Sequence, residues 1–391
     1  MPLGLYVSIP FCRTKCTYCN FASDVFSKNA FQQYVNRVCQ SITEAATIAR
    51  TVGGQFEREA DSIYLGGGTP TVLDINDLQR IFVTISQNFK VEAESEVTVE
   101  VAPGTLTPAG VEAFCSCGVN RVSLGVQSFV DKEAASVGRL HKRETILADI
   151  ARLRTAGIQN ISVDLIAGLP HQTAESWQRS LEQVIATGVP HVSVYMLEVD
   201  QDSRLGRELI AGGTKYHAHF VPDDELTADF YGMACEELEQ TGVRQYEISN
   251  FAREGFESHH NLKYWTRRPY FGFGVDAHSM LLREGLEAIR FSTPDSLDEY
   301  VAAKALAQNC VDQHAALEEE MFLGLRLNRG VNLDRIASLF GAPALETFLP
   351  VIREFVELGL LEQRHAVILL TGRGRLLSNE VFERFVSSTT V

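Results

Sequence analysis

Short apolar runs alternate with amphipathic stretches along the first half of the chain. The apolar runs are rich in Val, Ile and Leu and predict buried strands, and the stretches between them predict helices. The expected strands cover residues 5–9, 62–65, 97–101, 121–126, 161–166 and 192–197, and the expected helices cover 30–50, 75–88, 108–117, 142–156 and 174–187. Such alternation favours an α/β fold with a parallel sheet, and six units suit an open, partial (β/α)6 barrel of the TIM type.

Three glycines support these boundaries. Gly118, Gly157 and Gly188 each follow a predicted helix and precede a predicted strand. Helices often end at a glycine, because glycine adopts the left-handed backbone conformation without steric cost. The glycines therefore predict the same helix ends as the hydrophobic pattern.

The pattern changes after residue 220. The expected elements are a helix over 224–241, a strand over 246–249, an aromatic and glycine-rich stretch over 264–274, three helices from 313, a strand over 366–370 and a turn over 371–375. The last part is typical of a small winged-helix domain, and its mixed charge favours a packing or interaction module over a nucleic-acid contact. The sequence thus predicts a core barrel over 1–220, a connecting segment over 221–312 and a winged-helix-like domain over 313–391.

Composition and charge narrow the classes of partner. The 391 residues are 45% hydrophobic and carry a formal net charge of −15. Binding of a polyanion over a broad surface is disfavoured, because such binding needs clustered Lys and Arg. No run reaches the roughly 18–20 apolar residues of a membrane helix, and residues 1–6 lack the features of a signal peptide. We therefore expect a cytoplasmic protein without nucleic-acid binding or an integral membrane segment.

Three of the eight cysteines lie close together near the start of the chain. Cys12, Cys16 and Cys19 form the pattern C-x3-C-x2-C. Thiolates suit zinc or iron–sulfur clusters, but structural zinc sites usually have four ligands and no second cysteine pair follows. A [4Fe–4S] cluster normally takes four cysteines, so three would leave one iron with an open coordination position. The pattern favours a cluster that binds a further ligand.

The other cysteines are expected to be structural. Cys39, Cys235 and Cys310 are isolated in helix-like sequence and are expected to be buried as small hydrophobic residues. Cys115 and Cys117 form a C-x-C pair that metal could use, although free core thiols are the favoured interpretation. The predicted metal chemistry therefore rests on the N-terminal cysteines.

Polar or glycine-rich residues end or follow most of the predicted strands. They include Gly66–Gly68, Glu100, Gln127, Arg139 and Asp164. Functional residues of parallel α/β folds gather where strands end, so these side chains are expected at one edge of the sheet. Charges in buried strands are costly unless they pair or bind a ligand. For Glu100 and Asp164 a buried salt bridge remains the alternative, and for Arg139 a simple surface position.

At this point the motifs resemble a known family. The cysteine pattern has an aromatic residue before its last cysteine and is followed by Gly-Gly-Gly-Thr-Pro, as in the radical S-adenosylmethionine (SAM) superfamily. Further motifs narrow the resemblance to the oxygen-independent coproporphyrinogen III oxidases and their relatives, the heme chaperones. These motifs are residues 6–10, 125–129, 138–141 and 164–170. The resemblance spans nearly the whole chain and implies a radical SAM barrel with a C-terminal domain.

The resemblance implies a specific set of cofactors. Cys12, Cys16 and Cys19 would hold a [4Fe–4S] cluster, and SAM would bind the remaining iron through its amino and carboxylate groups. In the family's enzymes an electron from the cluster cleaves SAM, and the resulting radical takes hydrogen from a propionate. The positions that match the family's SAM contacts are Tyr6, Tyr18, Gly67, Gly68, Thr69, Glu100, Gln127, Arg139 and Asp164. The family commonly has Asn where Ala102 stands, so one amide is missing beside the expected SAM site.

Three features favour the heme-chaperone branch over the oxidases. The resembling oxidases have a longer N-terminal extension before the first motif, and they have a fourth cysteine where this sequence has Phe21. The third feature is His260-Asn-Leu-Lys-Tyr264-Trp265, which matches the H-N-x-x-Y-W pattern associated with heme binding in the chaperone branch. Imidazole is a usual axial ligand of heme iron and phenolate a rarer one. His259 could compete as the ligand, and the alternative is that this stretch only packs the open side of the barrel.

The leading hypothesis is a protein that binds heme and transfers it to an unidentified acceptor protein, with a cluster and exchangeable SAM in support. The second is a radical SAM enzyme that decarboxylates coproporphyrinogen III. A third is an enzyme that acts on heme itself, such as a ring-opening methyltransferase. The sequence leaves open whether the chain is an enzyme and whether SAM is cleaved.

Overall fold

Twelve strands form one large sheet and three form a smaller one in the computed structural model, which describes residues 1–387. The large sheet has the order β12-β11-β10-β9-β1-β2-β3-β4-β5-β6-β8-β7. Its central strands β1 to β6 pair in parallel, as predicted for six βαβ units. Their bounds are β1 (Leu3–Ile9), β2 (Glu59–Gly67), β3 (Lys90–Val101), β4 (Arg121–Gln127), β5 (Asn160–Ala167) and β6 (His191–Met196).

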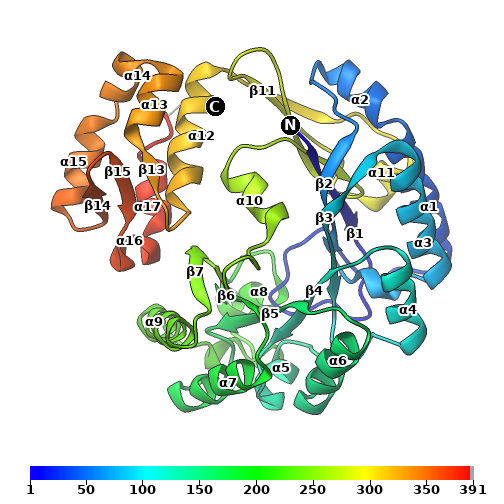
Figure 1. Ribbon diagram of the computed structural model, residues 1–391. Coiled ribbons are helices and arrows are strands. Elements are labelled where there is room, and N and C mark those ends of the chain that lie inside the picture. The colour runs from blue at the N-terminus through cyan, green and yellow to red at the C-terminus, as the bar shows by residue number, and fades with distance from the viewer. Residues whose placement is uncertain (388–391) are drawn as a thin grey trace.

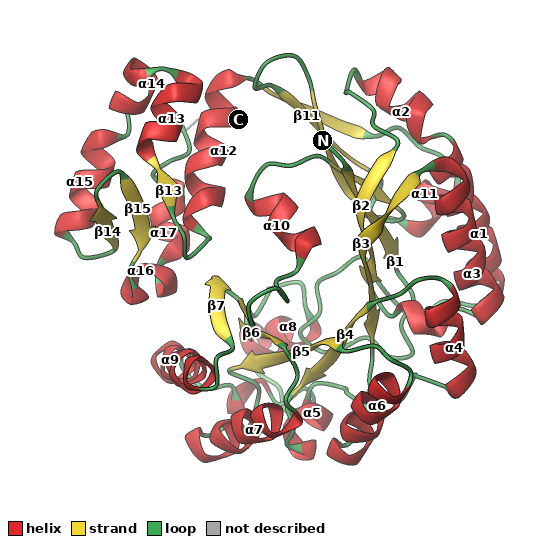
Figure 2. Cartoon of the chain, in the orientation of Figure 1, coloured by secondary structure: helices red, strands yellow, loops and turns green. Residues whose placement is uncertain are grey.

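Helices connect these strands and cover the outside of the sheet (Figure 2). They are α1 (Lys28–Thr43), α2 (Ala45–Val52), η1 (Pro70–Val72), α3 (Ile75–Asn88), α4 (Pro108–Ser116), α5 (Asp131–Ser136), α6 (Arg143–Thr155), α7 (Ala174–Thr187), α8 (Arg204–Ala211), η2 (Ala218–Phe220) and α9 (Asp224–Gln240). The single helix predicted over 30–50 is divided at Glu44, whose N–H still bonds to the carbonyl of Gln40. Most predicted boundaries agree within two residues.

Local sequence explains where the helices begin and end. Thr173 and Ser176 form a capping box at the start of α7, and Gly188 ends that helix with a φ of 65°. Gly118 and Gly157 also have positive φ, at 76° and 92°. In α3 the residues Leu78, Ile81, Phe82 and Ile85 are buried, which is the spacing of an apolar helix face against a sheet.

The second half of the chain extends the sheet at both ends. The hairpin β7 (Arg244–Glu247) and β8 (Asn250–Ala252) lies beside β6, where the sequence predicted one strand over 246–249. At the other end lie β9 (Tyr270–Phe273), β10 (His278–Leu282), β11 (Ala288–Ser292) and β12 (Ala307–Val311), with α11 (Leu297–Val301) before β12. These strands have three to five residues, too few for a clear period, and the sequence analysis did not predict β9 to β12.

The C-terminal part has its own apolar core. It contains α12 (Gln313–Leu325), β13 (Val331–Asn332), α13 (Leu333–Phe340), α14 (Ala342–Glu346), α15 (Leu349–Glu357), β14 (Leu361–Arg364), β15 (Val367–Leu370), α16 (Gly372–Leu376) and α17 (Ser378–Glu383). Buried residues such as Met321, Ile336 and Phe385 join in one cluster around the small sheet, which has the order β13-β15-β14. Helices with a small antiparallel sheet agree with the predicted winged-helix type.

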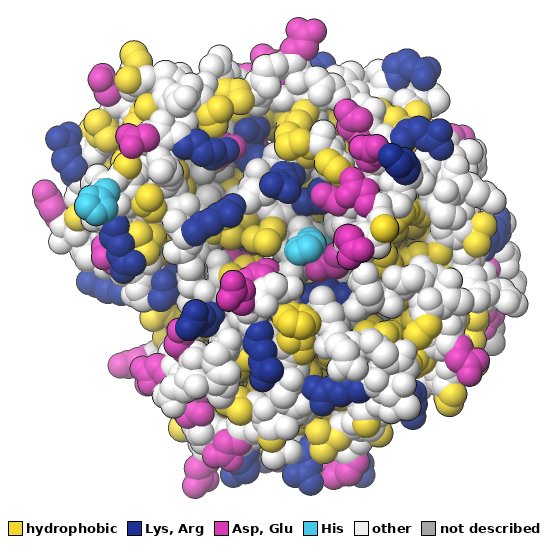
Figure 3. Space-filling view, viewed as in Figure 1, with side chains coloured by type: hydrophobic (Ala, Val, Ile, Leu, Met, Phe, Trp, Pro, Cys, Tyr) yellow, Lys and Arg dark blue, Asp and Glu magenta, His cyan; other side chains and the backbone are white. Residues whose placement is uncertain are grey.

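The strands of the large sheet curve around a central space in which α10 (His259–Trp265) lies (Figure 1). Acidic and basic side chains alternate over the face that Figure 3 shows, and neither kind forms a broad patch there. Within residues 1–387, no helix is long and apolar enough to cross a membrane.

Candidate functional site

The cysteine-containing loop directly follows β1 and is closed at its base. Phe11 pairs with Asp24, the N–H of Cys12 donates to the carbonyl of Asp24 at 3.0 Å, and the N–H of Asp24 donates to the carbonyl of Pro10 at 2.9 Å. Farther along, the N–H of Thr17 donates to the carbonyl of Val137 at 3.2 Å. The loop is therefore fixed both to its own strand and to the segment after β4.

The three thiols are partly buried on this loop. Burial raises the pKa of the Cys12 thiol, and the nearby Cys19 and Cys16 raise it further. Within residues 1–387, no three His, Cys, Asp or Glu side chains converge on a point that would hold one metal ion. That arrangement does not match a structural zinc site. In a cuboidal cluster each thiolate binds a different iron, so the three sulfurs need not converge.

The glycine run after β2 lies against the cysteine loop. A Cβ on Gly68 would lie 2.8 Å from the carbonyl oxygens of Ile9 and Phe11 and 3.0 Å from Sγ of Cys12, which no side chain tolerates. Gly67 has a φ of 100°, a conformation that favours glycine. The run is therefore required for the close approach of β2 to the cysteines.

Glu100 ends β3 inside the barrel without a cationic partner. Its carboxylate accepts a hydrogen bond from Oη of Tyr64 at 2.8 Å and from the N–H of Gly67 at 3.1 Å. Burial is the largest cause that raises the pKa of Glu100 to about 7, and the neighbouring Asp164 raises it further. No ion pair to Glu100 occurs among the described residues, so the salt-bridge alternative was wrong. A cationic ligand would compensate this carboxylate.

Asp164 and Gln127 lie on adjacent strands near Glu100. Both carboxylate oxygens of Asp164 lie 3.1 Å from the Ser123 hydroxyl, and burial raises the pKa of Asp164. The part of the chain that the structure describes holds no ion pair to Asp164 either. Gln127 has a φ of 68°, and the register between β4 and β5 shifts at Gln127. Strained residues and bulges of this kind cluster at functional sites.

Arg139 and Tyr18 join the loop after β4 to the cysteine loop. Arg139 donates from Nη2 to Oη of Tyr18 at 3.0 Å, while its buried Nε has no hydrogen-bond partner among the described residues. Arg139 is partly buried and bonded to Tyr18, so a simple surface position was wrong. A guanidinium with an unused donor suits a carboxylate ligand.

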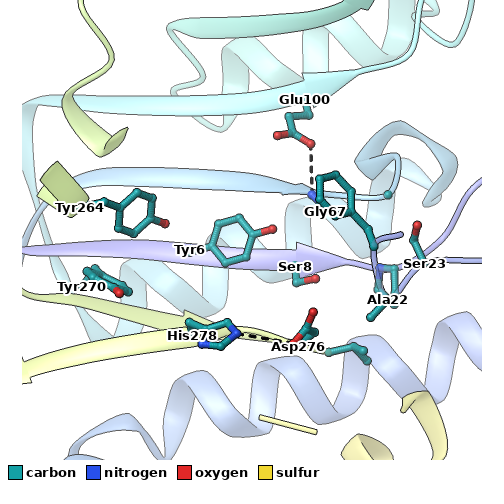
Figure 4. A pocket seen from close by; sticks show the side chains of 14 residues that line it. Tyr6, Ser8, Ala22, Ser23, Gly67, Glu100, Tyr264, Tyr270, Asp276 and His278 are labelled. Atoms are coloured by element: carbon teal, nitrogen blue, oxygen red, sulfur yellow. Dashed lines mark hydrogen bonds and ion pairs between the residues drawn. The ribbon is translucent and has the colours of Figure 1, made fainter. Parts of the chain in front are cut away.

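Two cavities lie beside the cysteine loop. The first has a volume of about 300 Å³ and is lined by residues that include Tyr6, Gly67, Gly68 and Glu100. Figure 4 shows Tyr6 between Tyr264 and Gly67 along β1, with Glu100 on one side and His278 and Asp276 on the other. The second cavity has a volume of about 350 Å³ and is lined by residues that include Cys16, Thr69, Ala102 and Arg139.

The predicted cluster and SAM residues therefore gather at the carboxyl end of the parallel strands. Gly68 lines the first cavity and lies against Sγ of Cys12, Thr69 lines the second, and the buried Nε of Arg139 lacks a partner among the described residues. A triad of thiols, an unneutralised carboxylate and an arginine with a free donor fit a cluster and a ligand that carries amino and carboxylate groups. Ala102 lines the second cavity, so the missing amide belongs to its wall.

The three residues predicted to contact heme have different surroundings. His260 is 1% exposed, and its Nδ1 lies 3.0 Å from the Ser62 hydroxyl and its Nε2 2.8 Å from Oη of Tyr264. Both ring nitrogens are thus occupied. Tyr264 lines the first cavity. Trp265 lies under the guanidinium of Arg326, whose carbon is 4.1 Å from the ring centroid.

Helix α10 closes the amino end of the barrel. The backbone N–H groups of His259 and His260 donate to the carboxylate of Glu96 at 3.1 and 3.0 Å. Lys263 pairs with Asp61 at 2.6 Å, close to the start of β2. These contacts agree with the alternative that this stretch packs the barrel. Ligation of heme iron by His260 would break one of these hydrogen bonds, so a heme contact through His260 stays a prediction.

The sequence analysis missed several residues of the site. Tyr64 and Ser123 hold the two carboxylates, and Asp276 and His278 line the first cavity from outside the six parallel strands. Tyr64 stands opposite Tyr6 in the register of β1 and β2, a signal that strand alternation carries. Asp276 and His278 had no such signal, because β9 and β10 were not predicted.

Two expectations about cysteines were wrong. Cys115 and Cys310 are exposed rather than buried, and Cys310 lies on the edge strand β12 rather than in a helix. An edge strand exposes one side of its backbone and part of its side chains, which a helical interpretation could not anticipate. Cys39 is buried, as expected, whereas Cys117 and Cys235 are only partly buried.

Comparisons with known proteins agree with this arrangement. The Radical SAM superfamily profile matches residues 6–184, and the HemN C-terminal domain profile matches residues 311–377. The chain is 35% identical to the heme chaperone HemW of Bacillus subtilis, over 97% of this chain and 98% of that protein. It is 33% identical to the mitochondrial radical S-adenosyl methionine domain-containing protein 1 of Mus musculus, over 84% of this chain and 74% of that protein.

The fold has a solved counterpart. Coproporphyrinogen III oxidase (HemN) from Escherichia coli, a radical SAM enzyme, superposes with a TM-score of 0.84 at 24% identity, over 98% of this chain and 90% of that one. At this identity the likeness concerns the fold alone. The near full-length sequence match to HemW is the more specific finding. The chain belongs to the radical SAM superfamily and, within it, to the family of the heme chaperone HemW.

Proposed function

We propose that this protein binds heme and transfers it to an acceptor protein. The observation that carries the proposal is the 35% identity to the heme chaperone HemW of Bacillus subtilis along 97% of the chain. Phe21 supports the proposal, because the resembling oxidases have a fourth cysteine at the position where this chain has an aromatic residue. The acceptor protein is a heme-binding protein whose identity the chain does not specify.

We infer that Cys12, Cys16 and Cys19 hold a [4Fe–4S] cluster and that SAM lies beside it. The cluster supplies an iron with an open coordination position when bound. The Glu100 carboxylate suits the ammonium of SAM, and the Arg139 guanidinium suits its carboxylate. The other proposed SAM contacts are Tyr6, Tyr18, Gly67, Gly68, Thr69, Gln127 and Asp164. Burial around these residues supports the proposal, because buried charges need partners.

For heme, Tyr264 is the predicted contact that reaches a cavity. Its phenol hydrogen-bonds to His260, which in turn is held by Ser62. His260 therefore supports heme binding indirectly, since it holds the phenol of Tyr264, and Trp265 remains a proposed heme contact beside it. The surface that meets the heme is the first cavity at the carboxyl end of the barrel, to which α10 contributes Tyr264.

The second candidate is the decarboxylation of coproporphyrinogen III. The likeness to HemN of Escherichia coli favours it, but that likeness extends only to the fold. The oxidase reaction needs the same cluster and SAM, so the cavity lining is common to both candidates. The two candidates therefore differ in what happens to the porphyrin: a chaperone passes heme on unchanged, whereas an oxidase decarboxylates coproporphyrinogen III.

The test uses protein reconstituted anaerobically with iron and sulfide. Heme is titrated into the protein, and apomyoglobin is then added as a generic heme acceptor. We expect one-to-one binding of heme, seen as a shift of the Soret band. Transfer of this heme to apomyoglobin should be faster than transfer of heme from albumin.

A parallel reaction supplies coproporphyrinogen III, SAM and a reductant to the same preparation. Protoporphyrinogen IX formed over many turnovers would contradict the chaperone proposal, as would the absence of heme binding. The Cys16→Ser variant serves as the control for cluster-dependent chemistry in both reactions.

A further inference from the structure

The rim of the first cavity consists of exposed residues from two distant segments. Phe21 on the cysteine loop is 63% exposed, and the side chains of His278 and Asp276 are 71% and 48% exposed. All three line the cavity together with the more buried Tyr264 and Tyr270. The rim thus places one imidazole and one phenyl ring at the entrance to an aromatic-lined cavity.

His278 differs from the other histidines that line a cavity or the barrel interior. His260 has both ring nitrogens occupied by Ser62 and Tyr264. His191 likewise lies between the hydroxyls of Ser162 and Tyr246. His141 lines the second cavity, but it is 8% exposed and its Nε2 bonds to the carbonyl of Val126. The imidazole of His278 is open to solvent.

Asp276 lies beside His278 at the rim, at a distance longer than a direct hydrogen bond. Nε2 of His278 lies 3.6 Å from Oδ1 of Asp276, and no hydrogen bond among residues 1–387 occupies its Nδ1 (Figure 4). Metal-bound histidines usually present their second nitrogen to a carboxylate or carbonyl, which orients the ring and strengthens the ligand. No hydrogen bond among residues 1–387 engages either ring nitrogen of His278, so the imidazole is free to bind a metal at the rim.

From these observations we propose that His278 is the axial ligand of heme iron, with the macrocycle lying against Phe21 over the rim. This inference rests on the proposed heme-carrying function and deepens it. A cavity of about 300 Å³ is smaller than a metalloporphyrin, so it takes one edge of the macrocycle and leaves the rest exposed. An exposed heme edge is what an acceptor protein must reach during transfer.

The charges at the cavity determine which edge enters. Glu100 and Asp276 contribute carboxylates to the lining, and the propionates of heme are anionic. Like charges repel in a poorly solvated cavity, so the apolar edge of the heme enters and the propionates remain in water. SAM is proposed to bind deeper, near Glu100, so heme and SAM occupy neighbouring rather than identical positions.

The test compares histidine variants of the cluster-containing protein. Heme is titrated into the wild type, His278→Ala, His260→Ala and His259→Ala, and resonance Raman spectra of the ferrous complexes are recorded for the iron–histidine stretch. His278→Ala should lose this band and weaken heme binding about tenfold, and added imidazole should restore the ligand signature. His259→Ala is the matched control, since His259 is exposed but lies on α10. SAM binding should be unchanged in His278→Ala.

A second variant tests the contact with the macrocycle. Phe21→Ala should keep the iron–histidine band and weaken heme binding about fivefold, because it removes apolar contact only. A wild-type band retained in His278→Ala, or lost in His259→Ala or His260→Ala, overturns the inference while the carrier function stands. A wild type that binds no heme overturns both.

Discussion

The two ends of the barrel contrast in how their polar groups are paired. At the amino end, α10 holds His260 between Ser62 and Tyr264, and Glu96 accepts from the backbone at the start of the helix. At the carboxyl end, Glu100 lacks a cation, and Arg139 has a buried nitrogen without a partner among the described residues. At the amino end His260 and Glu96 are therefore hydrogen-bonded within the protein, whereas at the carboxyl end Arg139 keeps a buried donor for a ligand.

This difference between the two ends indicates which residues bind a ligand. Buried polar groups are normally hydrogen-bonded, so an unsatisfied group marks either a cost or a binding site. A sequence motif alone does not separate these cases. His260 belongs to the heme-associated motif yet is enclosed, whereas His278 belongs to a short strand and is open to solvent at the rim. The predictions below test this contrast, beginning with the largest effect.

Replacement of Cys16 by serine should abolish the cluster. The variant removes one of three thiolates on the loop, and a hydroxyl is a poor ligand for iron in a cluster. Iron and sulfide content and the visible absorbance of the reconstituted protein measure the effect. Cys115→Ser is the matched control, because Cys115 is exposed and lies outside the loop. A full cluster in Cys16→Ser would refute the three-ligand site.

Replacement of His260 by alanine should destabilise the fold by about 2 kcal/mol, because Ser62 and Tyr264 lose a buried partner. Denaturant unfolding at neutral pH measures this effect, and His259→Ala should stay near the wild type. An unchanged stability of His260→Ala would contradict the structural role of α10.

The same histidine predicts a pH dependence. Burial is the main cause that lowers the pKa of His260 to about 3, whereas the unfolded chain has an ordinary histidine. The stabilisation is therefore complete above about pH 6.5 and is lost as pH falls towards 3. Melting temperatures between pH 7 and 5 should fall less steeply in His260→Ala than in the wild type. The same dependence of melting temperature on pH in both proteins would contradict a lowered pKa of His260.

Glu100→Gln should separate stability from binding. Because the folded pKa of Glu100 is raised to about 7, its stabilisation is present at acid pH and is lost as pH rises through 7. Without added SAM, the variant should melt at a higher temperature than the wild type at pH 8. Its affinity for SAM should fall about tenfold, since the ammonium loses a carboxylate partner.

Calorimetry under anaerobic conditions measures the SAM affinity of Glu100→Gln, and thermal melts at pH 5 and pH 8 measure its stability. The gain in melting temperature should shrink at pH 5, where Glu100 is protonated in the folded wild type. Equal SAM affinity in both proteins would remove Glu100 from the proposed site.

Ala102→Asn should have the smallest effect, a gain in SAM affinity of about fivefold. Ala102 lines the second cavity, and an amide there restores the group that the family commonly has. Ala102→Val adds bulk without the amide and should not tighten binding. Equal SAM affinities of Ala102→Asn and Ala102→Val would show that the amide does not cause the gain in affinity.

The sequence predicted the parallel strands and the residues at their ends because both depend on local signals. Buried strands appear as apolar runs, and Glu100 and Asp164 stand out as charges within them. The rim could not be predicted in the same way. His278 reaches the first cavity only because β9 pairs with β1 and β10 follows, which is a tertiary arrangement of short strands. The enclosure of His260 also depends on tertiary contacts, with Ser62 far away in sequence.

Hydrogen exchange with and without heme distinguishes binding at the rim from binding at α10. Mass spectrometry of the cluster-containing protein would report protection of peptides across residues 19–24, 257–268 and 275–280. Heme binding at the rim predicts strong new protection in the first and third of these segments and weaker protection in the second, where Tyr264 of α10 lines the same cavity. Protection confined to residues 257–268 would contradict heme binding at the rim and would indicate binding at α10 instead.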